Sequence, residues 1–278
     1  MRRRDGTAMA LVTERGVDID PEIGDRHISG QGTPEHRWRT WDGLPRLPDV
    51  TADELVPPGS RAVIVAPHPD DEVLACGGLL SLLGAAGRDV LVIGVTDGEA
   101  SHPGSSKWTP RLLAQRRRQE RETGLQILLS SGLSTTVALA LPDGGVALHE
   151  ARLQDDLKRH LLPRDVVLTT WRLDGHPDHE ATGRAAVAAA RWRGVRCWEM
   201  PVWMWHWARP DDGRVPWRRM RRLALDGQAR SRKSRAIAAH GTQLVPSPAD
   251  GTAPVLPDWA LARLLRPFEV FIASEPSP

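Results

Sequence analysis

The sequence predicts an α/β protein of Rossmann-like type, with a mostly parallel sheet that has helices on both faces. Short, continuous apolar runs at 61–66 and 89–95 have the length and composition of strands buried on both faces. Such runs alternate with helical patterns over residues 61–200, and this alternation is typical of βαβ units. With 278 residues, the chain is long enough to bury a substantial core.

The alternation can be followed element by element along the chain. Strands are expected at 61–66, 89–95, 136–141, 165–170 and 195–200. Helices are expected at 72–86, 110–129, 151–162 and 179–193. The pattern then becomes less regular, with an expected aromatic strand or loop at 201–207, a basic helix at 217–239, a loop at 246–257, a helix at 259–265 and a last strand at 268–272.

The chain divides into an N-terminal arm and one larger unit. Residues 1–60 are polar and rich in Pro and Gly, and their aromatic patch contains Trp38 and Trp41. We expect an extended arm with a frayed start, packed on the domain through these two indoles. Residues 61–278 are expected to form a single domain with irregular C-terminal elements near the substrate.

Composition excludes several classes of protein. A formal net charge of +2 gives no basis for nucleic-acid binding. The two cysteines have no metal-type spacing, so we expect reduced thiols. The basic start, Met1 to Arg4, resembles part of a signal peptide, but the apolar segment that should follow is missing, which favours a cytoplasmic protein. The basic pattern at 217–239 favours a solvated face over contact with a membrane.

Two short motifs carry most of the functional information. The first, Pro-His-Pro-Asp-Asp-Glu at 67–72, follows the first expected strand, and the second, Gly-His-Pro-Asp-His at 175–179, follows the fourth. Asp97-Gly98-Glu99 and Leu141-Pro142-Asp143-Gly144 follow the second and third strands. Ligands bind outside the carboxyl ends of the strands in an open parallel sheet, so these polar clusters are expected on one rim.

The spacing within the motifs favours a metal site over simple helix capping. His68 and Asp71 lie three residues apart and can converge if the first turn is helical, and His176 and His179 have the same spacing. Capping explains acidic residues at a helix start but does not explain paired histidines. The motifs therefore predict a site for one divalent metal ion, with groups left over for proton transfer. Spacing alone does not say which residues are the ligands.

The two motifs in this order resemble the PIG-L (LmbE-like) N-acetylglucosamine deacetylases, over residues 61 to about 200 and more weakly to Gln243. The resemblance implies one deacetylase domain that hydrolyses the acetamide of an N-acetylglucosaminyl small-molecule conjugate, releasing acetate and a free amine. It implies the following roles: Zn2+ held by His68, Asp71 and His179, Asp70 as general base, His176 charged or hydrogen-bonding near the developing oxyanion, and a later signature of Lys233, His240 and Gln243 on the substrate side.

One departure from the family concerns the acid that protonates the leaving amine. Members of the mycothiol pathway carry a tyrosine shortly before the second motif, whereas this chain has no tyrosine and has Asp174 in that neighbourhood. His176 and Asp70 are the candidates for this acid. Arg117 and Glu120, on the helix expected at 110–129, are interpreted as a helical ion pair rather than as catalytic groups.

Further residues are candidates for binding substrate. Asp97, Glu99 and His102 are expected to bond to sugar hydroxyls, although turn chemistry around Gly98 is an alternative. Trp203 and Trp205 belong to an alternating segment that would place indoles on one face of a strand, either in the core or as a wall for an aromatic aglycone.

The sequence leaves three functions open. The first is deacetylation of a secondary metabolite in antibiotic biosynthesis, such as a glycopeptide pseudoaglycone of the teicoplanin type. The second is action on mycothiol-type thiol conjugates as amidase or deacetylase. The third is a non-catalytic sugar-binding module, which leaves the metal motifs unexplained and predicts no dependence on chelators.

Overall fold

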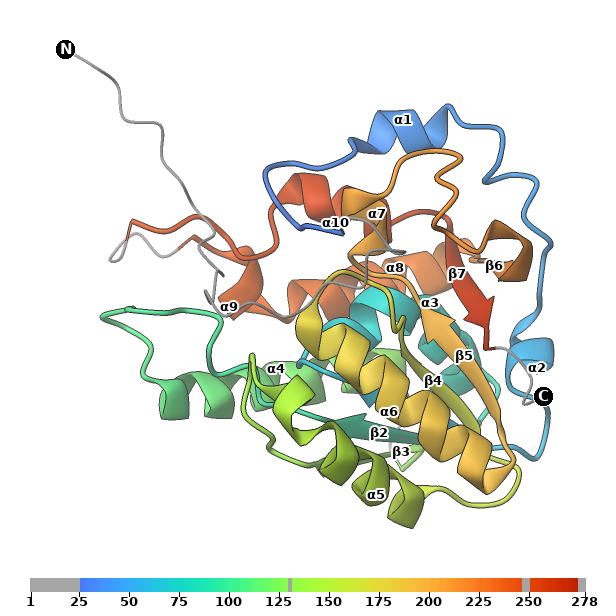
Figure 1. Ribbon diagram of the computed structural model, residues 1–278, viewed down its shortest axis with the longest axis horizontal. Coiled ribbons are helices and arrows are strands. Elements are labelled where there is room, and N and C mark those ends of the chain that lie inside the picture. The colour runs from blue at the N-terminus through green and yellow to red at the C-terminus, as the bar shows by residue number, and fades with distance from the viewer. Residues whose placement is uncertain (1–25, 130–131, 247–250, 275–278) are drawn as a thin grey trace.

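The computed structural model describes residues 26–129, 132–246 and 251–274. Within these residues a seven-stranded sheet with the order β3-β2-β1-β4-β5-β7-β6 lies at the centre of the fold (Figure 1). The strands are β1 Ala62–Ala66, β2 Val90–Gly94, β3 Ser134–Ala138, β4 Val166–Thr170, β5 Arg196–Met200, β6 Met220–Ala224 and β7 Phe268–Ala273. The pairs among β1 to β5 are parallel, whereas β7 is antiparallel to β5 and β6. The predicted α/β class is confirmed.

Helices cover both faces of this sheet. The longer helices are α3 Asp71–Ala85, α4 Pro110–Leu128, α5 Glu150–His160, α6 Pro177–Arg193 and α8 Gly227–Ala238. The shorter ones are α1 Glu35–Arg39, α2 Ala52–Leu55, α7 Met204–Trp207, α9 Gly241–Leu244 and α10 Asp258–Leu264, with 3-10 turns at Val146–His149 and Trp217–Arg219. Successive side chains of β1 point to opposite faces of the sheet, so each face has its own layer of helices. Ile64 packs with α3 and α8 on one face, and Val63 and Val65 pack with α5 and α6 on the other.

A break inside α3 allows the second piece of that helix to bond to β7. Cys76 has non-helical angles (φ −137°, ψ 24°), so the helix is divided into two pieces. The buried carboxylate of Glu269 on β7 accepts the N–H groups of Gly78 (2.6 Å) and Leu79 (2.8 Å) at the start of the second piece. Lys233 Nζ lies 2.7 Å from the same carboxylate, which neutralises its charge.

Two expectations for the region after β5 are wrong. The segment at 201–207, expected as a strand or loop, has no strand and forms the one-turn helix α7 over its last four residues, because the consecutive N–H groups of 202–204 bond to the carboxylate of Asp174. The basic segment 217–239 is not one helix but a 3-10 turn, strand β6 and helix α8. Asp226 begins α8 by accepting the N–H of Ala229 at 2.7 Å, and the surrounding arginine pattern hid this boundary.

The N-terminal arm wraps around the edge of the domain. Its described part passes over α1 at the top of the view and down to α2 (Figure 1). Trp38 is fully buried and donates its indole N–H to the carbonyl of Trp205 at 3.0 Å. Trp41 packs edge-on against Trp217, with ring centroids 4.7 Å apart. The expected frayed start, with the basic Met1 to Arg4, lies outside the described residues.

Candidate metal centre

The two histidine motifs meet at the carboxyl edge of the parallel strands. His68 follows β1, and Asp70 is the N-cap of α3, which begins at Asp71. His176 is the N-cap of α6, after the loop that leaves β4. Because β1 and β4 are hydrogen-bonded neighbours, α3 and α6 begin close to each other. The structure thus brings together the residues that the sequence placed on one rim.

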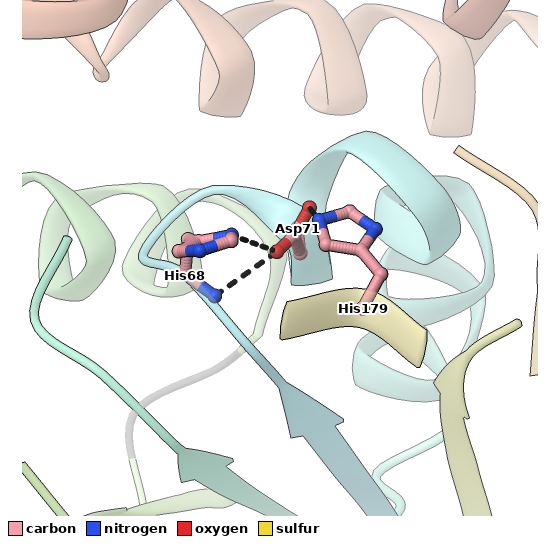
Figure 2. A group of neighbouring side chains, drawn as sticks. All are labelled: His68, Asp71 and His179. Atoms are coloured by element: carbon pink, nitrogen blue, oxygen red, sulfur yellow. Dashed lines mark hydrogen bonds and ion pairs between the residues drawn. The ribbon is translucent and has the colours of Figure 1, made fainter. Parts of the chain in front are cut away.

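His68, Asp71 and His179 form a compact group of metal-ligating side chains. Figure 2 shows both imidazoles turned toward the carboxylate between them. Asp71 Oδ2 lies 3.1 Å from His68 Nδ1, and Asp71 Oδ1 lies 3.3 Å from His179 Nε2. The ligand atoms of the three residues all lie within 4.8 Å of one another. A second group of the same compactness consists of His68, His176 and Asp178.

A carboxylate behind His179 makes this donor set suitable for a metal. Asp174, which is fully buried, has Oδ2 2.8 Å from His179 Nδ1. A carboxylate at this position requires the hydrogen on Nδ1 and leaves Nε2 to point toward Asp71, as a metal-bound histidine needs. Two imidazoles and one carboxylate on a buried rim are a donor set that fits a divalent transition metal.

Without a metal, protons balance the charges of this group. Burial opposes a charged imidazole, but Asp71 and Asp174 outweigh it and raise the pKa of His179 to about 9. Burial likewise opposes charge on His68, yet its carboxylate partners raise its pKa well above the ordinary value. Burial raises the pKa of Asp71, whereas His179 and His68 lower it more, to well below its usual range. A metal ion must displace these protons when it binds.

Asp70, which lies next to Asp71 in the sequence, forms an ion pair with an arginine. Its carboxylate is buried, and Arg117 Nη2 lies 3.2 Å from Oδ2. Burial raises the pKa of Asp70 above its ordinary value, although Arg117 opposes this shift. Arg117 also donates to the carbonyl of Gly98 at 2.9 Å. The expected Arg117–Glu120 ion pair is wrong, since the helical partner of Glu120 is Arg116 (3.2 Å), and Glu120 also accepts the N–H and hydroxyl of Thr242.

His176 is placed as a neutral hydrogen-bond donor. Its Nδ1 accepts the N–H of Asp178 at 3.2 Å, so the hydrogen of the neutral ring belongs on Nε2. Burial, with the neighbouring His179 and His68, lowers the pKa of His176 to about 3. Of the two forms that the resemblance allows, the structure therefore favours the hydrogen-bonding one over the charged one.

The loops after β2 and β3 complete the rim. Glu99 Oε1 accepts the N–H of Asp143 at 3.0 Å, and Asp143 Oδ1 lies 3.2 Å from His68 Nε2. Asp97 is buried, with Oδ1 3.5 Å from Arg118 Nε. His102 Nδ1 lies 3.0 Å from Ser101 Oγ, and Gln243 Nε2 lies 3.4 Å from the same Ser101 Oγ. Asp97, Glu99, His102 and Gln243 therefore gather around one loop beside the metal centre.

Sequence reasoning did not assign three residues at the centre: Arg117, Asp143 and Asp178. Asp178 is fully buried, lies 3.2 Å from His68 Nε2 and accepts the N–H of Gly144 at 2.7 Å. Its position inside the second motif was a usable signal, as was the Asp143-Gly144 turn directly after the third strand. For Arg117 the sequence contains no local signal, because its partner Asp70 lies at the start of a different helix, α3.

Three of the expected substrate-binding residues are placed in the interior. Lys233 is buried in its ion pair with Glu269, and Trp205 is buried edge-on against Trp38 with ring centroids 5.2 Å apart. Their placement contradicts a contact with substrate and supports the core interpretation of Trp205. His240 is also buried, with Nδ1 3.0 Å from the carbonyl of Ala236. Trp203 is half-buried and donates its backbone N–H to Asp174.

One known family matches the stretch of the chain that contains the two motifs. Residues 63–190, which contain both motifs, match the family described as PIG-L: GlcNAc-PI de-N-acetylase. This stretch is a PIG-L domain. No curated protein sequence matches the chain. Among the described residues, none of the helices has the length and apolar character needed to cross a membrane.

Solved structures share the fold of this PIG-L domain and its surroundings. The A40926 pseudoaglycone deacetylase Dbv21 is 24% identical, with a TM-score of 0.59, over 79% of this chain and 99% of its own. The conserved protein TT1542 from Thermus thermophilus is 25% identical, with a TM-score of 0.55, over 78% of this chain and 96% of its own. The deacetylase in a deacetylase–teicoplanin complex from the teicoplanin pathway is 19% identical, with a TM-score of 0.53, over 78% of this chain and 100% of its own.

Proposed function

We propose that the protein is a zinc-dependent N-deacetylase that hydrolyses the acetamide of an N-acetylglucosaminyl conjugate and releases acetate and a free amine. The observation that carries this proposal is the convergence of His68, Asp71 and His179 beside the buried Asp70. The match of this same stretch to a de-N-acetylase family supports the reaction. Zn2+ is the metal we propose, because two imidazoles and a carboxylate are a common catalytic zinc set.

The side chains divide the work of the reaction among themselves. A bound zinc ion supplies positive charge that polarises the acetamide carbonyl and makes water more acidic. Asp70 takes the proton of the attacking water, since burial raises its pKa toward the range useful for proton transfer. His176 donates its Nε2–H to the oxygen on which negative charge develops.

Breaking the carbon–nitrogen bond requires a proton on the leaving amine. Asp174, which stands near the place of the missing tyrosine, is fully engaged by His179 and by backbone N–H groups. Of the two candidates for this acid, Asp70 can deliver the proton once it has taken it from the attacking water, whereas His176, with its pKa lowered to about 3, is a neutral ring that does not act as an acid. The products are acetate and the free glucosamine nitrogen.

We propose a secondary metabolite as the substrate, such as a glycopeptide pseudoaglycone. The structural neighbours that act in A40926 and teicoplanin chemistry support this choice. The test measures acetate and free amine from N-acetylglucosaminyl glycopeptides, lipids and thiol conjugates, with and without a chelator. Cleavage without acetate would instead identify an amidase, and no cleavage with any of them would leave the sugar-binding module.

A further inference from the structure

A segment outside the PIG-L match lies against the loop that leads into the candidate metal centre. Residues 26–33, called the strap here, begin at Arg26, the first described residue. Its guanidinium forms a two-point ion pair with Glu180, with Nε 3.0 Å from Oε1 and Nη2 3.2 Å from Oε2. Glu180 follows His179 directly, and its Oε1 also accepts the N–H of Gly175 at 2.9 Å. One carboxylate thus joins the strap, the start of α6 and the loop before His176.

The backbone of the strap also touches this loop directly. Gly175 has φ +95°, and a Cβ built there would lie 2.6 Å from the carbonyl oxygen of Arg26 and 2.9 Å from the indole nitrogen of Trp207. The loop is therefore enclosed between the strap and Trp207, at a distance that a glycine permits. Trp207 in turn donates its indole N–H to the carbonyl of Asp174 at 2.7 Å.

The rest of the strap is fastened to α7. His206 Nε2 donates to the carbonyl of Ser29 at 2.9 Å, and Thr33 N–H donates to the carbonyl of His206 at 2.8 Å. Arg263 bonds both to His206 Nδ1 (3.1 Å) and to the carbonyl of Gln31. The N–H groups at the start of α7 bind the carboxylate of Asp174, which holds His179. A second route therefore connects the strap to the centre.

From these contacts we infer that the strap is a positioning element of the reaction centre, and that Arg26 is its main positioning residue. Through Glu180 and Gly175, Arg26 fixes the loop that carries His176 and the carboxylate partner of His179. The Arg26 and Glu180 side chains are only 15% and 16% exposed, so their fork-shaped pair is better shielded from solvent than an ordinary surface pair. The effect on turnover rests on the proposed function, whereas the effect on loop order and metal affinity does not.

The test compares Arg26→Ala and Arg26→Lys with the parent full-length protein. Three quantities are measured: hydrogen exchange of the amides at 172–180, zinc affinity by competition with a chelating dye, and kcat with KM. For Arg26→Ala we expect faster exchange at 172–180, zinc affinity lower by about 10-fold, and a fall in kcat, because lost outer contacts typically weaken a metal site to this degree. Arg26→Lys should recover part of each loss, since lysine keeps the charge but not the fork.

Asp49→Ala is the matched control. It removes a different ion pair of the arm, that with Arg222 (2.8 Å), which ties the arm to edge strand β6. We expect exchange at 172–180 and zinc affinity as in the parent. Unchanged exchange and zinc affinity in Arg26→Ala would overturn the inference, and so would equal losses in Asp49→Ala. If the parent protein releases no acetate, the proposed function fails, while exchange and zinc affinity still decide the role of the strap.

Discussion

The carboxylate of Asp174 links the metal centre to the segment after β5, and Asp174→Asn tests this link with little change in shape. Oδ1 accepts the N–H groups of Val202 (3.0 Å) and Met204 (2.9 Å). Oδ2 accepts the N–H of Trp203 (2.9 Å) and faces His179 Nδ1 (2.8 Å). In the variant one oxygen becomes an NH2 group, which cannot accept any of these hydrogens.

The structure sets the size of the expected effect. Placing the NH2 group at Oδ1 would leave two backbone N–H groups without an acceptor, so it is expected at Oδ2, where Trp203 alone loses its backbone bond. One buried N–H without an acceptor should lower the free energy of unfolding by about 1–3 kcal/mol. The NH2 group also forces His179 to move its hydrogen from Nδ1 to Nε2, the atom needed for the metal. Zinc affinity should therefore fall by roughly 10–100-fold.

Guanidinium unfolding and zinc competition titration measure the two effects separately. Asp165→Asn serves as the control, because Asp165 is equally buried, pairs with Arg61 and accepts the N–H of Leu162 (2.7 Å) at the other end of β4. This control should lose stability and keep its zinc affinity. An Asp174→Asn protein that is less stable but binds zinc as tightly as the parent would refute the assigned role of Asp174.

Further predictions concern Asp70, His179 and the Arg117 contact. Asp70→Asn should lower kcat by about 10²–10⁴-fold while zinc content stays normal, and loss of zinc would instead make Asp70 a ligand. Zinc affinity should rise with pH between 6.5 and about 9, because folded His179 keeps its proton up to about pH 9 and zinc must displace that proton. A zinc affinity that does not change over this pH range would contradict the raised pKa of His179. The raised pKa of His179 also stabilises the metal-free fold, fully below pH 6.5, and this stabilisation is lost as the pH rises through about 9. Thermal unfolding of the metal-free protein at a series of pH values measures this loss. Gly98→Ala would drive a Cβ into Arg117 Nη1, so it should displace Arg117 from Asp70 and reduce kcat more than zinc affinity; equal losses in both would show general damage to the rim.

The sequence was sufficient to predict the sheet and the meeting of the two motifs. Every residue of β1 and β2 is buried, as the continuous apolar runs at 61–66 and 89–95 indicated, and every residue of β4 is buried as well. Parallel strands end on one edge, so a motif after β1 and another after β4 had to lie near each other once these strands became neighbours. This is a consequence of topology and needs no knowledge of side-chain contacts.

Contacts between elements distant in sequence could not be predicted in this way. Arg117 has an acidic residue at helical spacing, and nothing local shows that it bonds to Asp70 instead. Alternation over 203–207 favoured a strand, whereas the three hydrogen bonds from 202–204 to Asp174 produce one helical turn. Lys233 fits a family signature by sequence, but its partner Glu269 lies on the last strand, in the core.

Acetate release from an N-acetylglucosaminyl glycopeptide is the decisive measurement for the proposed zinc-dependent deacetylase. The zinc-loaded protein is expected to release one acetate for each amine formed, a chelator should abolish the reaction, and added Zn2+ should restore it. Release of acetate that persists after complete removal of metal would rule out a zinc-dependent reaction. Tight zinc binding without acetate from any N-acetylglucosaminyl conjugate would rule out a deacetylase.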